Sequence, residues 1–152
     1  MVDFKNPNLQ SILLIEDEED HARLIMKGLK SVMNLINDIV WIENGGDAVD
    51  FLHRKGKYHD QTYELPGLIL LDLKLPIKDG FEVLEEIKVD KVLKKIPIVM
   101  LTTSSNTDDV SKALELGAND FIVKPVRFDD FILKISNLGY YWGFVSDSNT
   151  KY

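Results

Sequence analysis

The sequence predicts an α/β fold in which a five-stranded parallel sheet is covered by helices on both faces. Short aliphatic runs of the kind found in strands buried on both faces occur five times, and amphipathic helical patterns separate them. Gly and Pro stand at several of the boundaries. Strands that alternate with helices in this way are typical of a doubly wound sheet with right-handed crossovers.

The clearest strand covers residues 68–71 and is followed at once by Asp72. Four aliphatic residues in a row suit a strand that is buried on both faces. A carboxylate is costly to bury without a partner, so we expect Asp72 at the carboxyl end of the strand, open to solvent, a metal or a reactant. Judged by residue type alone, Asp72 is explained about equally well as a turn or helix-capping residue. The rest of the chain decides between these interpretations.

The first strand is expected over residues 11–15, and it also stops at carboxylates, Glu16 and Asp17. The acidic residues that follow favour the N-terminus of a helix. Apolar residues then recur at helical spacing and predict its buried side: Ala22, Ile25, Met26, Leu29, Val32 and Met33.

A second strand and a second helix follow in the same order. The strand is expected over residues 38–42 and a turn over 43–46. The helix ends near Gly56, and the polar segment 57–65 is expected to be an extended loop. The buried side of this helix is predicted to contain Ala48, Val49, Phe51 and Leu52.

Beyond the central strand the pattern repeats twice more. Asp79-Gly80 starts a helix, and a fourth strand over 96–101 ends in hydroxyls, of which Thr102 is the first. A helix from about Thr107 precedes a fifth strand over 121–123, which Lys124-Pro125 stops. The inward residues of the three remaining helices are predicted to be Phe81, Leu84 and Ile87; Val110, Ala113 and Leu114; and Phe128, Phe131, Ile132, Ile135, Leu138 and Trp142.

Length and composition indicate one soluble globular domain. The chain has 152 residues, and we expect an N-terminal extension over 1–10, the domain over 11–144 and a loose tail over 145–152. A net charge of -7 argues against binding to nucleic-acid backbones or anionic membranes. The absence of cysteine excludes disulfides and thiolate chemistry, and no segment resembles a signal peptide or a membrane span, so a cytoplasmic location is expected.

The residues at the strand ends predict one polar site. The carboxyl ends of parallel strands share an edge of the sheet, where ligands bind. Three carboxylates there repel one another by roughly 3 kcal/mol per pair at about 5 Å and an effective dielectric of about 20, so a divalent cation is expected between them. Oxygen ligands favour Mg²⁺, or Mn²⁺, over Zn²⁺. The residues predicted to converge are Glu16, Asp17, Asp72, Thr102 and Lys124.

This set of side chains suits phosphoryl transfer to Asp72. A metal neutralises the acids, the Asp72 carboxylate attacks phosphorus, and Lys124 and Thr102 supply a positive charge and a hydrogen-bond donor to the phosphoryl oxygens. A small-molecule phosphatase or phosphotransferase is an alternative, although Lys74 stands where a second acid would act as general acid. A flavin-binding electron carrier is disfavoured because acids follow the first strand and repel a phosphate.

Taken together and in order, these motifs resemble the receiver domains of two-component response regulators over roughly residues 11–138. The resemblance implies a flavodoxin-like (βα)5 fold with strand order 2-1-3-4-5 and a sensor histidine kinase that phosphorylates Asp72. It also implies that the metal is bound by Glu16, Asp17, Asp72 and the backbone carbonyl of Lys74. Lys124 falls on the phosphate-binding lysine, Thr102 on the switch hydroxyl, and Phe121 on the switch aromatic, which is usually Tyr.

Further details resemble the small stand-alone regulators of bacterial phytochrome histidine kinases. They are the loop from Arg54 to Pro66, the Ile96-Pro97 pair, the run 101–104 and the aromatic end of the last helix. This likeness implies a phytochrome-type kinase, no output domain of its own and an unknown downstream protein. It also implies a homodimer through the last helix, although packing explains its aromatic residues about as well as a partner does. The candidate interface residues are Tyr140, Tyr141, Trp142 and Phe144.

Overall fold

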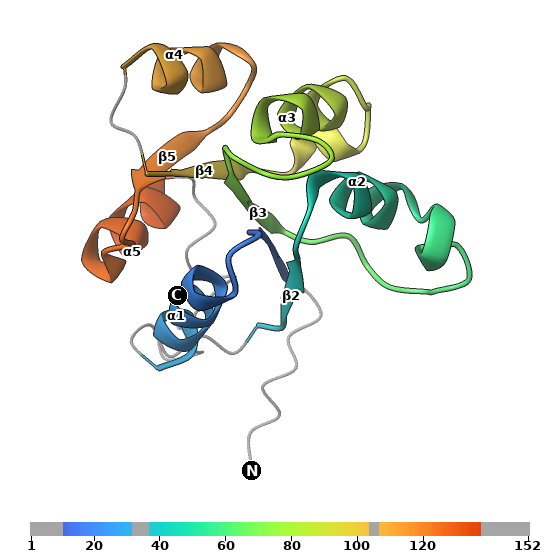
Figure 1. Cartoon of the computed structure of the whole chain (residues 1–152), viewed down its shortest axis with the longest axis horizontal. Coiled ribbons are helices and arrows are strands. Elements are labelled where there is room, and N and C mark those ends of the chain that lie inside the picture. The colour runs from blue at the N-terminus through green and yellow to red at the C-terminus, as the bar shows by residue number, and fades with distance from the viewer. Residues whose placement is uncertain (1–10, 32–36, 104–106, 138–152) are drawn as a thin grey trace, which may run out of the picture.

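The computed structural model describes residues 11–31, 37–103 and 107–137, and in them a parallel sheet lies between two layers of helices (Figure 1). The strand order is β2-β1-β3-β4-β5, which confirms the predicted flavodoxin-like topology. The strands are β1 (Ile12–Ile15), β2 (Ile39–Ile42), β3 (Leu68–Asp72), β4 (Ile98–Thr102) and β5 (Asp120–Val123).

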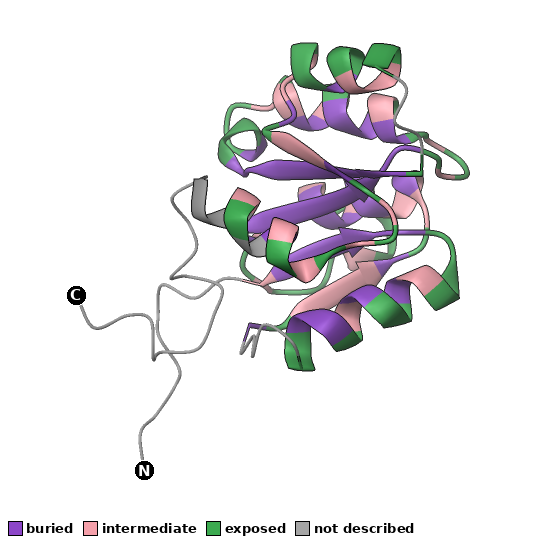
Figure 2. Ribbon diagram, turned by 90° about the vertical axis from the view of Figure 1, so that its left-hand side faces the viewer, coloured by how far each residue is buried: buried purple, intermediate pink, exposed green. Residues whose placement is uncertain are grey.

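Helices cover both faces of the sheet, and their apolar sides fill two separate cores. One face carries α1 (Glu19–Ser31) and α5 (Phe128–Asn137), with Ala22, Leu29 and Phe131 buried. The other face carries α2 (Gly45–His53), α3 (Gly80–Lys88) and α4 (Thr107–Glu115). Figure 2 shows the central strands buried, the edge strands β2 and β5 only partly buried, and the helices exposed on their outer sides, as the helical spacing predicts.

The registers of the strands bring their carboxyl ends to one edge of the sheet. Ile15 pairs with Ile42 on one side and with Leu71 on the other. Across the remaining strands, Leu71 pairs with Met100, and Thr102 pairs with Val123. The residues after each strand therefore meet at this edge although they lie far apart in the sequence.

Local sequence explains how α3 begins so close to the end of β3. Asp79 and Glu82 form a capping box, in which the Asp79 carboxylate accepts from the Glu82 amide at 3.0 Å. This confirms that Asp79-Gly80 starts a helix. A side chain at residue 80 would lie 2.4 Å from the Asp72 carbonyl oxygen, so only glycine allows this approach.

The structure corrects two of the predictions from the sequence. Leu114, predicted to point inward, is 43% exposed. Ala113 is the buried residue of the short helix α4. Leu116, just after the helix, packs against the core instead. The segment predicted as an extended loop begins within the 3-10 helix η1 (Gly56–Tyr58) and returns to α2, because the Tyr63 ring stacks on Phe51 at 4.5 Å.

Several predictions concern residues outside the described part of the chain. These are the helical positions Val32, Met33, Leu138 and Trp142, the extension 1–10 and the tail 145–152. The side chains of Ile132 and Ile135 are likewise outside the description, although α5 contains both residues. Within the described ranges, no helix is long and apolar enough to cross a membrane.

Candidate functional site

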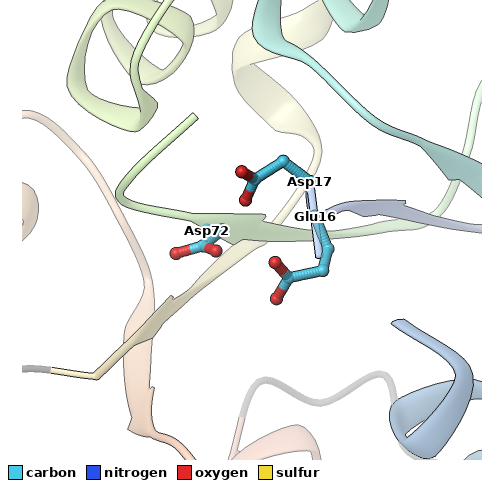
Figure 3. Close-up of side chains that lie close together, drawn as sticks. All are labelled: Glu16, Asp17 and Asp72. Atoms are coloured by element: carbon cyan, nitrogen blue, oxygen red, sulfur yellow. The ribbon is translucent and has the colours of Figure 1, made fainter. Parts of the chain in front are cut away.

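Three carboxylates meet at the carboxyl edge of the sheet, as the sequence predicts. Glu16 and Asp17 follow β1, and Asp72 is the last residue of β3 (Figure 3). Each side chain offers an oxygen, and these three oxygens lie within 4.8 Å of one another. Glu16 is 0% and Asp72 6% exposed, while Asp17 is exposed to solvent. The cluster is therefore open to solvent at Asp17.

Lys124 joins the cluster from the opposite end of the chain. It follows β5, and its Nζ donates to Asp72 Oδ2 at 2.9 Å and to Glu16 Oε1. Its backbone amide donates to the Thr102 carbonyl oxygen at 2.7 Å, which continues the pairing of β4 with β5 beyond the last strand residue. The side chain is only 7% exposed, so the ammonium depends on these acidic partners.

Burial and charge shift the proton affinities in this cluster. Burial raises the pKa of Glu16 above its usual 4.5, and the neighbouring Asp72 acts in the same direction, against hydrogen bonds from Lys124 and the Glu18 amide. Burial by itself lowers the pKa of Lys124, but the hydrogen bonds to Glu16 and Asp72 outweigh it and raise the pKa. Three carboxylates facing one ammonium leave an excess of negative charge in a site made of oxygen donors. This donor set fits a hard divalent cation.

The remaining predicted residues lie around this cluster. Thr102 is buried at the end of β4, and the Lys74 amide lies 3.3 Å from Asp72 Oδ1, to which it donates. Asp17, Lys74 and Thr102 line a groove of about 510 Å³ that also reaches Asp109 on α4. That the Lys74 carbonyl binds the metal stays a prediction.

Phe121, the predicted switch aromatic, lies on β5 and is half-buried. The Lys134 ammonium on α5 lies 4.4 Å from its ring centre and donates to its carbonyl oxygen. The ring therefore connects β5 with α5, and its movement on phosphorylation stays a prediction. The candidate interface residues Tyr140, Tyr141, Trp142 and Phe144 lie outside the described residues.

The sequence interpretation missed two residues that contact the site. His21, expected to be a solvated or partly packed histidine, places Nδ1 3.3 Å from Lys124 Nζ. The Trp41 indole on β2 donates to the Glu16 carbonyl oxygen at 2.7 Å and fixes the chain where it leaves β1. His21 follows Asp17 by four residues, so it lies in the first turn of α1, close to the acids. This spacing is a sequence signal that could have identified it as a site residue. Nothing near Trp41 in the sequence points to a contact with the end of the neighbouring strand.

Comparisons with known proteins agree with the described fold. The model of the response regulator receiver domain family matches residues 12–136. The chain is 39% identical over 142 residues to the response regulator Rcp1 of Synechocystis sp., which covers 93% of this chain and 94% of Rcp1.

Solved structures give the same picture. The bacteriophytochrome response regulator AtBRR is 42% identical with a TM-score of 0.80, over 88% of this chain and 95% of AtBRR. The Mn²⁺-bound form of Rcp1 has a TM-score of 0.72 at 39% identity, over 88% of this chain and 94% of that one. The phosphorylated cyanobacterial phytochrome response regulator RcpA has a TM-score of 0.71 at 37% identity, over 88% of this chain and 93% of that one.

Proposed function

We propose that this chain, which belongs to the response regulator receiver domain family, is a signalling module switched by phosphorylation of Asp72. The observation that carries the proposal is the position of Asp72. Its carboxylate lies close to two further acids and pairs with the buried Lys124 ammonium, and the exposed acid, Asp17, lines a groove. An acceptor, a cation site and a positive charge for a phosphoryl group are thus within reach of one another.

The cation in this proposal is Mg²⁺, with Mn²⁺ as a substitute. Glu16, Asp17 and Asp72 offer carboxylate oxygens close enough for one ion, and we assign the Lys74 carbonyl as a fourth ligand. A bound cation neutralises the carboxylates and stabilises the negative charge that develops during phosphoryl transfer. The Mn²⁺-bound form of Rcp1 supports a divalent cation in a similar protein.

The phosphodonor is a phosphohistidine of a sensor histidine kinase. An Asp72 carboxylate oxygen attacks phosphorus, the bond between phosphorus and the donor nitrogen breaks, and the donor imidazole takes up a proton. Lys124 then turns from the carboxylates to a phosphoryl oxygen, and the Thr102 hydroxyl donates to another. The half-buried Phe121 would shift with Thr102 and pass the change to the α5 side.

A phytochrome-type kinase is the partner that the similar proteins favour. AtBRR is named a bacteriophytochrome response regulator and RcpA a phytochrome response regulator, and this chain is 42% and 37% identical to them. We also propose a homodimer through the last helix, an unnamed downstream protein and a cytoplasmic location, which rest on the sequence. Analytical ultracentrifugation with and without beryllofluoride, on wild type and on Tyr141→Ala, tests the dimer.

The rival reading as a small-molecule phosphatase or phosphotransferase has no support in the comparisons. Residue 74, two positions beyond the acceptor, is an exposed lysine and offers no general acid to a leaving group. The proposed module accepts and loses its own phosphoryl group without turning over another substrate. Phosphorylated metabolites should therefore stay intact in its presence.

The decisive experiment measures the intact mass after incubation with acetyl phosphate and Mg²⁺. Wild type should gain one phosphoryl group, and Asp72→Asn should gain none. Asp109→Asn is the matched control, because this carboxylate lines the same groove without belonging to the acidic cluster. Equal phosphorylation of Asp72→Asn and wild type would show that another residue is the acceptor.

A further inference from the structure

Lys124 has partners on three different elements, and one of them carries no negative charge. Among the described residues, Nζ contacts Glu16 after β1, Asp72 on β3 and His21 on α1. An ammonium has three hydrogens and no lone pair, so it donates to all three. The two carboxylates belong to the proposed cation site, whereas His21 stands beside it.

The contacts of His21 show which ring nitrogen can accept from the ammonium. Because Nδ1 accepts from Lys124, the ring hydrogen must lie on Nε2. Nε2 is 3.3 Å from Glu18 Oε2, so it can donate there. His21 thus offers Nδ1 as an acceptor to the ammonium, and Glu18 orients its ring from the outer side. The backbone amide of Glu18 in turn donates to Glu16 Oε2 at 3.1 Å.

A cation and the Lys124 ammonium compete for the same carboxylates. A divalent ion bound to Glu16, Asp17 and Asp72 would repel the ammonium. It would also neutralise the carboxylates that attract the ammonium in its absence. Lys124 cannot simply extend into solvent, because its side chain is 7% exposed. An ammonium left in that position without an acceptor would oppose binding of the cation.

From this geometry we infer that His21 is a positioning residue, which retains the Lys124 ammonium beside Asp72 when a divalent cation takes the carboxylates. The inference rests on the proposed function and adds a residue to it. His21 lowers the cost of admitting the cation and keeps the lysine close to the place where a phosphoryl group is to be bound.

The test is calorimetric titration of the intact chain with Mn²⁺, which needs no phosphorylation. His21→Leu removes the acceptor and should weaken Mn²⁺ binding by about tenfold, the equivalent of one hydrogen bond to a charged group. His21→Asn keeps an oxygen acceptor on a short side chain and should remain within about twofold of wild type. Arg23→Ala, which among the described residues breaks only the exposed α1 pair with Glu19, is the control and should bind as wild type does.

A double-mutant cycle separates positioning from a general effect on α1. In a Lys124→Met background no ammonium has to be retained, so His21→Leu should leave the Mn²⁺ affinity unchanged. Equal affinities of wild type and His21→Leu would overturn the inference, and so would a tenfold loss that persists without Lys124. Failure of the proposed function has a different signature: wild type would bind Mn²⁺ but gain no phosphoryl mass from acetyl phosphate.

Discussion

In β1 and β3 the strand interior and the acid at the carboxyl end, Glu16 or Asp72, are both buried but have opposite chemistry. Within β1 every side chain is fully buried and aliphatic, and the next residue, Glu16, is also 0% exposed. Likewise Leu70 in β3 is 1% exposed and Asp72, two residues on, 6%. Burial stabilises the first group by about 25 cal/mol per Å² of apolar surface and costs free energy for the second.

The difference teaches that the site is built at the expense of stability. Glu16 and Asp72 remain buried because Lys124 and backbone donors compensate them, and the proposed cation would add to this, whereas the aliphatic residues need only one another. A change in the interior should therefore reduce the free energy of unfolding, and a change among the acids should mainly alter chemistry and cation binding.

The largest effect on stability is expected from the interior of β3. Leu70→Ala should lower the free energy of unfolding by about 2–5 kcal/mol, because the cavity cannot close between two helix layers. Asp72→Asn should leave it unchanged or raise it, since the amide relieves the repulsion with Glu16. Urea unfolding of both variants measures this. If Asp72→Asn lowered the free energy of unfolding as much as Leu70→Ala does, the distinction between the strand interior and the site would be wrong.

Removing the ammonium should have the next largest effect. Lys124→Met leaves Glu16 and Asp72 buried without their cationic partner and should cost about 3 kcal/mol when no divalent cation is present. Excess Mg²⁺ should restore most of that loss, because the cation replaces the missing charge. Lys112→Met, a change at an exposed lysine whose ammonium lies over the Phe81 ring, should show no such rescue.

Wild type should itself gain stability from Mg²⁺. At a concentration of about a hundred times its dissociation constant, a ligand bound only by the folded state adds about 2.7 kcal/mol. Thermal unfolding with Mg²⁺ and with a chelator measures the gain. Asp17→Asn removes the exposed member of the cluster and should reduce the gain strongly, while the interior of the sheet remains as it is. An undiminished gain in Asp17→Asn would place the cation elsewhere.

The smallest expected effect is the dependence of folding stability on pH. The pKa of Glu16 in the folded protein lies above its usual 4.5, so the folded state retains a proton that the unfolded chain releases. The contribution of Glu16 to stability is therefore fully present below pH 4.5 and is lost as the pH rises through the folded-state pKa. In the absence of divalent cations, Glu16→Gln should abolish this decline, as urea unfolding at a series of pH values would show. A decline that persists unchanged in Glu16→Gln would assign it to another group.

The sequence by itself determined the fold class, the strand positions and the identity of most of the site. Aliphatic runs that end in Asp72, Thr102 or Lys124 are local signals, because a strand buried on both faces tolerates polar residues only where it ends. The start of α3 at Asp79-Gly80 is equally local, since capping depends on residues three positions apart.

Only the tertiary structure decided how these ends contact one another. The bond from Lys124 to Glu16 joins residues 108 positions apart, and the Trp41 contact with Glu16 joins two neighbouring strands. Helical spacing likewise could not show that Leu114 lies on the outer side of α4, or that His21 reaches Lys124. Periodicity indicates which face of an element is apolar, whereas the crossovers between parallel strands set which residues meet, and that arrangement is a property of the whole sheet.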